Sequence, residues 1–254
     1  NIYLKVLYKC NKDEFDLNTK TPMKSIIKLF IFSILLATFS CNGDFQLYEV
    51  QTSRVEINNN VSQDSTFLKF IKPYKKNIEK DLYTTYAYSP KTYDKKNGDL
   101  NTALGNMMAD AVYKLANPVF KSKKSKNIDF VLLNYGGIRS VVSTGNINKN
   151  TAYNLMPFEN EVVVAKLSGN NVYGLINYLA IARLAHPISR LKIELDENYK
   201  LVNAEINNNK IDIDKYYYVA TSDFLLKGGD KMTFFEKSIE NTHLNYKIRD
   251  LLID

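Results

Sequence analysis

The stretch Ile128-Asp-Phe-Val-Leu-Leu-Asn-Tyr-Gly-Gly-Ile-Arg139 joins a largely apolar run to a polar loop that contains two glycines. The run over residues 128–133 predicts a buried strand. In the loop, Gly136-Gly137 stands between Asn134 and Arg139. Glycine lets a ligand approach the backbone closely, and a guanidinium group offers a planar fork of donors that suits phosphate or carboxylate. The stretch therefore predicts a strand that ends in a ligand-binding loop.

A second run, Phe224-Leu-Leu-Lys-Gly-Gly-Asp230, follows the predicted strand Tyr216-Tyr-Tyr-Val-Ala220 in the same way. The carboxylate of Asp230 accepts hydrogen bonds of the kind that paired ribose hydroxyls donate, and Phe224 is able to stack on a base. Met156-Pro157-Phe158 lies between the two runs and adds a second aromatic side chain beside a rigid proline. Each glycine pair alone is more often only a turn. Together the segments predict a nucleoside or nucleotide pocket built from loops.

Both helices and strands are predicted after residue 66. Helical spacing is shown by Leu104, Met107, Met108, Ala111, Val112 and Leu115 after a cap at Asn101 or Thr102, and by Val172, Leu175, Ile176 and Leu179 after a cap at Ser168. Further helices are expected over 67–82 and 245–252, and strands over 161–167, 191–195, 201–206, 210–213 and 216–221, with a hairpin turn at Asn207-Asn208-Asn209. Helices lead and strands cluster later, which predicts an α+β fold with a mixed β-sheet and packed helices.

The first 66 residues are expected to lie outside this domain. Residues 1–22 are polar and lack an initiator Met, which indicates an upstream, non-native extension. Residues 23–40 have the form of an export signal, with an apolar stretch that is short for a membrane span. The signal ends before Cys41 in a run that resembles a relaxed bacterial lipobox, so we expect a lipid on Cys41; the alternative is an ordinary signal peptide with an incidental Cys. Residues 41–66 predict a flexible tether, and 67–254 one domain.

The net charge of +7 does not indicate nucleic-acid binding. Lys greatly outnumbers Arg, and the short runs Lys75-Lys76 and Lys123-Lys124 are typical of solvated faces rather than of a binding stripe. We expect the protein to be exported and held by its lipid in the bacterial cell envelope, facing either the periplasm or the surface.

From about Phe67 to its end, the chain resembles the C-terminal domain of 5′-nucleotidases, the group that contains ecto-5′-nucleotidase and periplasmic UDP-sugar hydrolase. The resemblance is carried by six segments in order: Leu104-Gly-Asn106, Asn134-Tyr-Gly-Gly-Ile-Arg139, Gly145-Asn-Ile147, Met156-Pro-Phe158, Lys166-Leu-Ser-Gly169 and Asp223-Phe-Leu-Leu-Lys-Gly-Gly-Asp230. In that family this domain binds the substrate.

The resemblance implies a role for each matched residue. Phe158 and Phe224 would sandwich the base, and Asp230 would hold the ribose hydroxyls. Asn134 would contact the nucleoside and Arg139 would face the phosphate. The glycine pairs Gly136-Gly137 and Gly228-Gly229 would shape the two loops and count among the binding residues.

The same resemblance implies that the chemistry lies elsewhere. The family hydrolyses its substrates with a separate N-terminal metallophosphatase domain, in which Asp, His and Asn side chains hold two metals. This chain has two histidines, His186 and His243, neither of them in such a motif, and His186 is expected in a loop without a chemical role. We therefore predict no catalytic residue, no metal ligand and no cofactor in this chain, with divalent metals only in a partner phosphatase.

One departure from the family concerns the phosphate. Many members carry an Arg and a Glu just before the Leu-Gly-Asn pattern, where this chain has Leu100, Asn101 and Thr102. Arg139 is left as the main expected anion contact, so the grip on a nucleoside should survive better than the grip on a phosphate.

Three functions fit these observations. The first is the nucleotide-binding part of a split 5′-nucleotidase, inactive alone, which presents substrate to a separately encoded metallophosphatase in nucleotide catabolism. The second is a surface nucleoside-binding lipoprotein with no enzymatic partner. The third, a degenerate domain kept for protein contacts, is disfavoured by the aromatic pair and Asp230.

Overall fold

The computed structural model describes residues 28–33, 52–58 and 60–254 of the 254-residue chain. The pattern of contacts divides the chain into two units, Asn1–Ser65 and Thr66–Asp254. In the first unit, residues 28–33 are helical and exposed. The expected extension over 1–22, Cys41, most of the export signal and part of the tether fall outside the described residues. None of the described helices is long and apolar enough to cross a bilayer.

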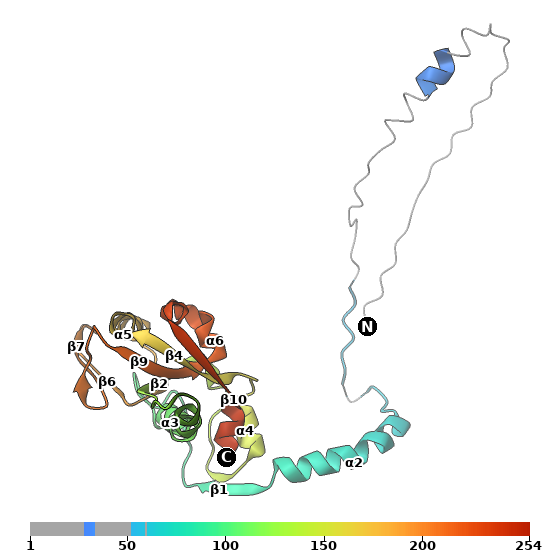
Figure 1. Cartoon of the computed structure of the whole chain (residues 1–254). Helices are drawn as coiled ribbons and strands as arrows, with labels where there is room; N and C mark the ends of the chain where they lie inside the picture. The colour runs from blue at the N-terminus through green and yellow to red at the C-terminus, as the bar shows by residue number, and fades with distance from the viewer. Residues whose placement is uncertain (1–27, 34–51, 59) are drawn as a thin grey trace, which may run out of the picture. The chain divides into compact units, whose positions relative to one another are not determined.

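The second unit is built on a five-stranded sheet with the order β10-β4-β9-β2-β5 (Figure 1). Its strands are β10 (Glu240–Lys247), β4 (Glu161–Ser168), β9 (Tyr216–Ser222), β2 (Phe130–Leu132) and β5 (Ile188–Ser189). β2 and β9 run parallel, whereas the other neighbouring pairs are antiparallel. The sheet is therefore mixed, as predicted.

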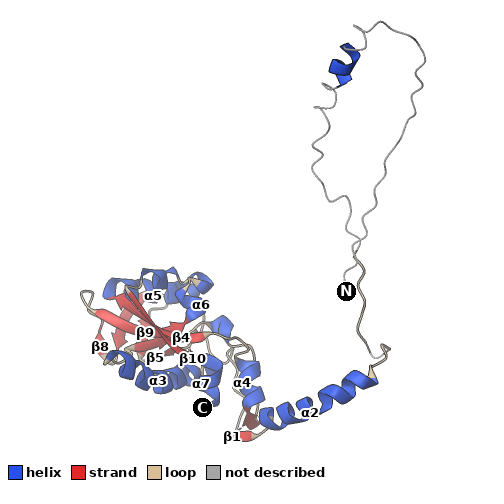
Figure 2. Ribbon diagram, turned by 45° about the vertical axis from the view of Figure 1, so that its right-hand side comes forward, coloured by secondary structure: helices blue, strands red, loops and turns tan. Residues whose placement is uncertain are grey.

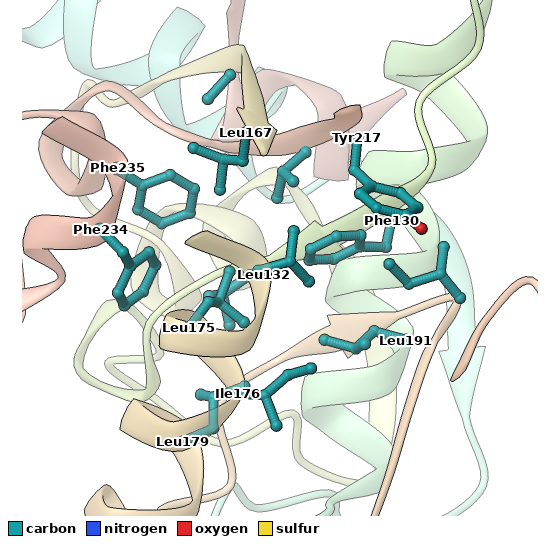
Figure 3. Packing of buried hydrophobic residues seen from close by; sticks show 14 of the residues in the cluster. Phe130, Leu132, Leu167, Leu175, Ile176, Leu179, Leu191, Tyr217, Phe234 and Phe235 are labelled. Carbon is teal, nitrogen blue, oxygen red and sulfur yellow. The ribbon is translucent and has the colours of Figure 1, made fainter. Parts of the chain in front are cut away.

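Helices cover both faces of this sheet (Figure 2). One face packs against α3 (Ala103–Lys124) and α7 (Ile248–Ile253), and the other against α5 (Gly169–Ala182) and the 3₁₀ turn η3 (Thr233–Lys237). Side chains of a strand alternate between faces. Phe130 and Leu132 accordingly lie in the core beneath α5 (Figure 3), whereas Val131 lies in the core beneath α3. Both cores depend on the short strand β2, which leads into the first glycine loop.

Several predicted elements are confirmed with small shifts of their ends. Helix α2 spans Ser65–Leu82, and Thr102 rather than Asn101 caps α3, its side chain accepting a hydrogen bond from the backbone N–H of Gly105. Ser168 caps α5 as expected. A separate three-stranded sheet is formed by β6 (Leu191–Leu195), β7 (Leu201–Ile206) and β8 (Asn209–Lys210). Its turn places Asn207 and Asn208 in the left-handed region, with φ of 52° and 61°.

Other predictions were wrong. The expected helix over 245–252 begins only at Ile248, and the strand expected over 210–213 ends at Lys210. Residues 240–247 instead form β10, because Thr242, Leu244 and Tyr246 face inward in alternation with polar residues, a period of two. In α3, Met108 is buried as expected, but Met107 is 45% exposed.

Besides β10, several further elements were not anticipated. They include β5, β1 (Thr85–Ser89), which pairs antiparallel with β3 (Gly145–Asn148), and the helices α4 (Lys149–Leu155) and α6 (Asp223–Leu226). A capping box of Asn148 and Thr151 starts α4. Both residues are visible in the sequence, but the spacing of apolar residues gave no sign of this helix. α4 leads the chain into the segment that contains Phe158.

Candidate functional site

The loops that hold the two glycine pairs meet at one edge of the central sheet. Because β2 and β9 are parallel, their C-terminal ends lie at the same edge, and the antiparallel β4 begins there. This places the segment after β2, the segment after β9 and the segment before β4 side by side. They surround a cavity of about 210 Å³ lined by Asn134, Gly136, Gly137, Arg139, Met156, Phe158, Asn160, Phe224 and Asp230.

Seven of the nine residues predicted for the site thus line one cavity, and the other two, Gly228 and Gly229, do not. Met156 and Asn160 are lining residues that the prediction lacked. Met156 belongs to the segment that predicted Phe158, and Asn160 follows two residues later, so proximity in sequence was the available signal.

The two loops are joined by a hydrogen bond between side chains. The Asn134 Nδ2 donates to the Asp230 Oδ2 at 2.6 Å. The first glycine pair makes room for this bond: a Cβ at Gly137 would lie 2.8 Å from the Asn134 Oδ1, and a Cβ at Gly136 would lie 3.4 Å from the Asn134 Nδ2. The missing Cβ at Gly137 therefore leaves the space that the Asn134 amide occupies.

The second glycine pair does not line the cavity but leaves room for side chains next to it. A Cβ at Gly229 would lie 2.5 Å from the Phe224 ring, closer than real Cβ contacts. Gly228 has φ of 78° and faces the Glu236 carboxylate, which a Cβ would meet at 2.3 Å. Asp230 itself is left-handed, with φ of 52°. The pair thus sets the position of Phe224 and the turn that presents Asp230.

Two aromatic side chains flank the cavity and are partly exposed. Phe158 is 38% exposed and Phe224 is 43% exposed. The guanidinium carbon of Arg139 lies 5.7 Å from the centre of the Phe158 ring, within cation–π range. The arrangement offers two apolar ring surfaces, a carboxylate and a cation around one opening.

Asp223 connects the segments that carry these two rings. Its Oδ1 accepts hydrogen bonds from the Asn160 Nδ2 at 3.0 Å and from the backbone N–H of Glu161 at 3.2 Å. The same oxygen accepts from the backbone N–H of Phe224 at 2.9 Å. The Phe158 segment and the Phe224 helix are therefore held together by one carboxylate.

His186 supports the first loop from inside. It lies in the loop between α5 and β5, as predicted, but it is buried, and its Nδ1 accepts a hydrogen bond from the backbone N–H of Tyr135 at 3.1 Å. Burial lowers the pKa of His186, and this outweighs the Leu133 carbonyl and the Asp230 charge, which both raise it. The neutral imidazole that results is the form whose Nδ1 can accept.

Lys95 holds the same loop from the other side, and nothing in its sequence context distinguishes it from the many other lysines. Its Nζ donates to the carbonyls of Tyr135 at 3.3 Å and Ile138 at 2.7 Å, and it lies 4.3 Å from the centre of the Tyr135 ring. Burial and then the nearby Arg139 charge lower the pKa of Lys95. The loop is thus fastened at Tyr135 by both His186 and Lys95.

A second cavity of about 190 Å³ lies between α5 and the β6–β7 hairpin. Its lining is mainly aliphatic and includes Leu100 and His186, with Asp196 and Tyr199. The other histidine, His243, lies on β10 with half of its side chain exposed. Within the described ranges, no group of three His, Cys, Asp or Glu side chains is placed to hold a metal ion.

Comparison with known proteins agrees with this architecture. Residues 83–237 match the family described as 5′-nucleotidase, C-terminal domain. The cell wall protein Lmo0130 of Listeria monocytogenes is 31% identical over 155 residues, which are 55% of this chain and 19% of that protein. A 5′-nucleotidase of Vibrio parahaemolyticus is 26% identical over 194 residues, 71% of this chain and 31% of that protein. The chain therefore spans less than a third of the length of either relative.

Solved structures show the same fold. The 5′-nucleotidase precursor from Thermus thermophilus superimposes with a TM-score of 0.59 at 20% identity, covering 75% of this chain and 40% of that one. The NAD nucleotidase of Haemophilus influenzae gives a TM-score of 0.55 at 18% identity, covering 75% and 38%. Since the family match covers more than half of the residues, the chain belongs to the 5′-nucleotidase C-terminal domain family, whose members form the substrate-binding part of these proteins.

Proposed function

We propose that the cavity binds the nucleoside part of a nucleotide, with the base between Phe158 and Phe224. The supporting observation is the Asn134–Asp230 pair at the opening between two exposed rings. Base–aromatic stacking contributes about 1–3 kcal/mol per base and tolerates different bases. Asp230 then accepts from the ribose hydroxyls, while Asn134 holds that carboxylate in place and contacts the nucleoside.

Arg139 takes the phosphate in this proposal. Among the described residues that line the cavity, it alone carries a positive charge, and it lies beside the Phe158 ring. A guanidinium forms paired, charge-assisted hydrogen bonds with phosphate oxygens. The phosphate would therefore leave the cavity on the Arg139 side, where a catalytic centre would have to reach it.

The reaction we propose is 5′-nucleotide hydrolysis, carried out by a separately encoded metallophosphatase to which this domain presents its substrate. This is supported by the 5′-nucleotidase relatives, of which the chain matches a part. In the two-metal chemistry of such phosphatases the metals clamp the attacking and leaving oxygens. This chain's own residues bind and orient the nucleotide.

We also propose that the protein is exported and anchored in the cell envelope through a lipid on Cys41. The support is the signal-like stretch over residues 23–40 and the 31% identity to a protein described as a cell wall protein.

A surface nucleoside-binding lipoprotein without an enzymatic partner is the alternative, and one observation favours it. Where many family members carry an Arg and a Glu before the Leu-Gly-Asn pattern, this chain has Leu100, Asn101 and Thr102, and none of the three lines the site. This alternative predicts that adenosine binds about as tightly as AMP, whereas presentation of a nucleotide requires the phosphate to add affinity.

The test is calorimetric titration of the purified protein with AMP and adenosine. Phe224→Ala and Asp230→Ala should abolish binding, whereas Phe70→Ala on helix α2 removes an equally large exposed ring and should leave it unchanged. Unaltered affinity in the first two variants would end both binding proposals. AMP hydrolysis by the purified chain with Mg²⁺ or Mn²⁺ would contradict the need for a partner.

A further inference from the structure

Helix α2 carries an apolar face that the described part of the protein leaves exposed. None of its 18 residues is buried. Phe70, Tyr74 and Ile78 are 65%, 60% and 58% exposed, and the Phe70 and Tyr74 rings lie 5.7 Å apart. α2 lies outside the layers of sheet and helices that hold the candidate site (Figure 2). Exposed apolar patches of this kind mark interaction sites.

The opposite side of α2 is basic. At 3.6 residues per turn, one side of the helix collects Ile71, Tyr74, Ile78 and Leu82, and the other collects Lys69, Lys72, Lys76 and Lys80. The acidic residues of α2 are both in ion pairs with lysines, Glu79 with Lys75 at 3.9 Å and Asp81 with Lys149 at 2.6 Å. The lysine row on the polar side therefore keeps its positive charge.

We propose that α2 lies in the surface of a membrane that contains anionic lipid. A helix with aromatic and aliphatic residues on one side, lysines on the other and low overall hydrophobicity is typical of helices that lie parallel to a bilayer. The Phe70, Tyr74 and Ile78 side chains enter the boundary between headgroups and acyl chains. The lysine stems run along the apolar surface and place their ammonium groups among the anionic headgroups.

The segment after α2 continues this surface. Tyr83, Tyr86 and Tyr88 are 57%, 54% and 66% exposed, and Tyr86 and Tyr88 belong to strand β1. Tyrosine is enriched at the interface between membrane and water, where its ring meets the apolar region and its hydroxyl meets water. Exposed aromatic and aliphatic side chains thus recur along the chain over residues 70–88.

The charge distribution favours a membrane over a protein as the partner. A protein that covers the apolar face leaves the lysine row pointing into solvent, where it adds nothing to binding. A bilayer contacts both the apolar face and the lysine row, because the helix lies at the depth where the lysine ammonium groups reach the lipid headgroups. A lipid on Cys41 would keep α2 close enough, since the chain from Cys41 to Ser65 spans up to about 80 Å when extended.

The absence of Trp from the sequence provides a direct test. A Phe70→Trp variant of the full chain carries a single indole on the apolar face, and a Lys76→Trp variant carries it on the basic side of the same helix. Each is mixed with vesicles of phosphatidylcholine alone or with a quarter of phosphatidylglycerol. Emission wavelength and quenching by iodide then report the surroundings of that one side chain.

We expect the Phe70→Trp emission to shift to the blue and to become protected from iodide with the anionic vesicles, and the shift to weaken several-fold in about 0.5 M salt. Lys76→Trp should stay quenchable. Tyr74→Ser with Ile78→Ser in the Phe70→Trp background should fold with an unchanged circular dichroism spectrum and lose at least about tenfold in binding of α2 to the vesicles, as read from the indole emission.

Three results would overturn the inference. One is an unchanged Phe70→Trp spectrum with every vesicle. Another is an equal response to neutral and anionic vesicles, which would remove the role of the lysines. The last is an indole already shielded from iodide in buffer without lipid, which would mean that protein, such as a second copy of the chain, covers the face.

Discussion

The side chains of Asn134 and Asp230 meet in a 2.6 Å hydrogen bond although 96 residues separate them in the chain. The bond closes the space between the loop that follows β2 and the loop that follows β9. Neither residue acts alone, because the carboxylate that would accept from a ribose is held in position by the amide. Single substitutions can remove the supports of this arrangement one at a time.

The Asn134–Asp230 bond should show a measurable coupling in a double-mutant cycle. Asn134→Ala, Asp230→Ala and the double variant are compared by urea denaturation. A hydrogen bond to a charged group is worth about 1.5–3 kcal/mol when buried, and solvent screening at this open site reduces our expectation to about 1 kcal/mol. Tyr178→Phe is the control, since the Tyr178 hydroxyl donates to the Asp230 backbone carbonyl and leaves the carboxylate untouched. Additive effects of the two alanines would contradict the coupling.

Gly229→Ala should reduce nucleoside binding although Gly229 does not line the cavity. A Cβ there would lie 2.5 Å from the Phe224 ring, so the ring must move. Overpacking of this kind costs about 1–3 kcal/mol, and a displaced stacking ring should lower adenosine affinity roughly tenfold or more. Gly174→Ala is the matched control, because a Cβ at Gly174 meets nothing within 4 Å and lies in helix α5. It should bind normally and gain helix stability.

Arg139→Gln should separate the two candidate functions. If Arg139 holds the phosphate, the change lowers AMP affinity by about ten- to a hundredfold, in line with the loss of a charge-assisted hydrogen bond, and leaves adenosine within about twofold. Arg183→Gln serves as control, because the Arg183 guanidinium stacks 3.9 Å from the centre of the Tyr199 ring, outside the lining of the site. Equal losses for AMP and adenosine would show that Arg139 acts through the Phe158 ring instead.

His186 should make stability depend on pH. Because its pKa is lowered in the folded state, the folded protein keeps His186 neutral while the unfolded chain takes up a proton. Its contribution is complete above the unfolded value of 6.5 and is lost as the pH falls below 6.5 toward the folded pKa. A protonated Nδ1 cannot accept from the Tyr135 N–H, so the loop loses that bond as well.

Thermal denaturation from pH 7.5 to 5 checks this. His186→Asn keeps an acceptor near the position of Nδ1 and does not titrate, so it should flatten the decline in melting temperature. His243→Asn changes a half-exposed side chain and should leave the profile as it is. An identical decline in wild type and His186→Asn would show that other groups cause it.

The sequence predicted the fold class because β2, β4 and β9 are apolar runs and α3 and α5 have apolar residues at helical spacing. It failed at β10, whose inward side is made of Thr242, Leu244 and Tyr246, too mixed in character to mark a strand. That strand is specified mainly by its pairing with β4, a contact between segments distant in sequence.

The candidate site was predictable in its composition and less so in its geometry. The residue types around Gly136 and Gly229 indicated a ligand, but only the structure shows that Gly229 lies behind Phe224. Lys95 and His186 were missed as supports of the site because each acts on the Tyr135 backbone, and backbone contacts leave no pattern of residue types.

The parallel pairing of β2 with β9 has a thermodynamic consequence. The cavity exists only when segments near residues 134, 158 and 230 have been brought to one edge of a finished sheet, so no part of the unfolded chain can hold a ligand in the same way. A ligand that binds there must therefore stabilise the whole domain against unfolding, by about 1.4 kcal/mol for each tenfold excess over its dissociation constant. Melting temperature becomes a readout of occupancy, by which libraries of nucleosides and nucleotides can be ranked without an assay for turnover.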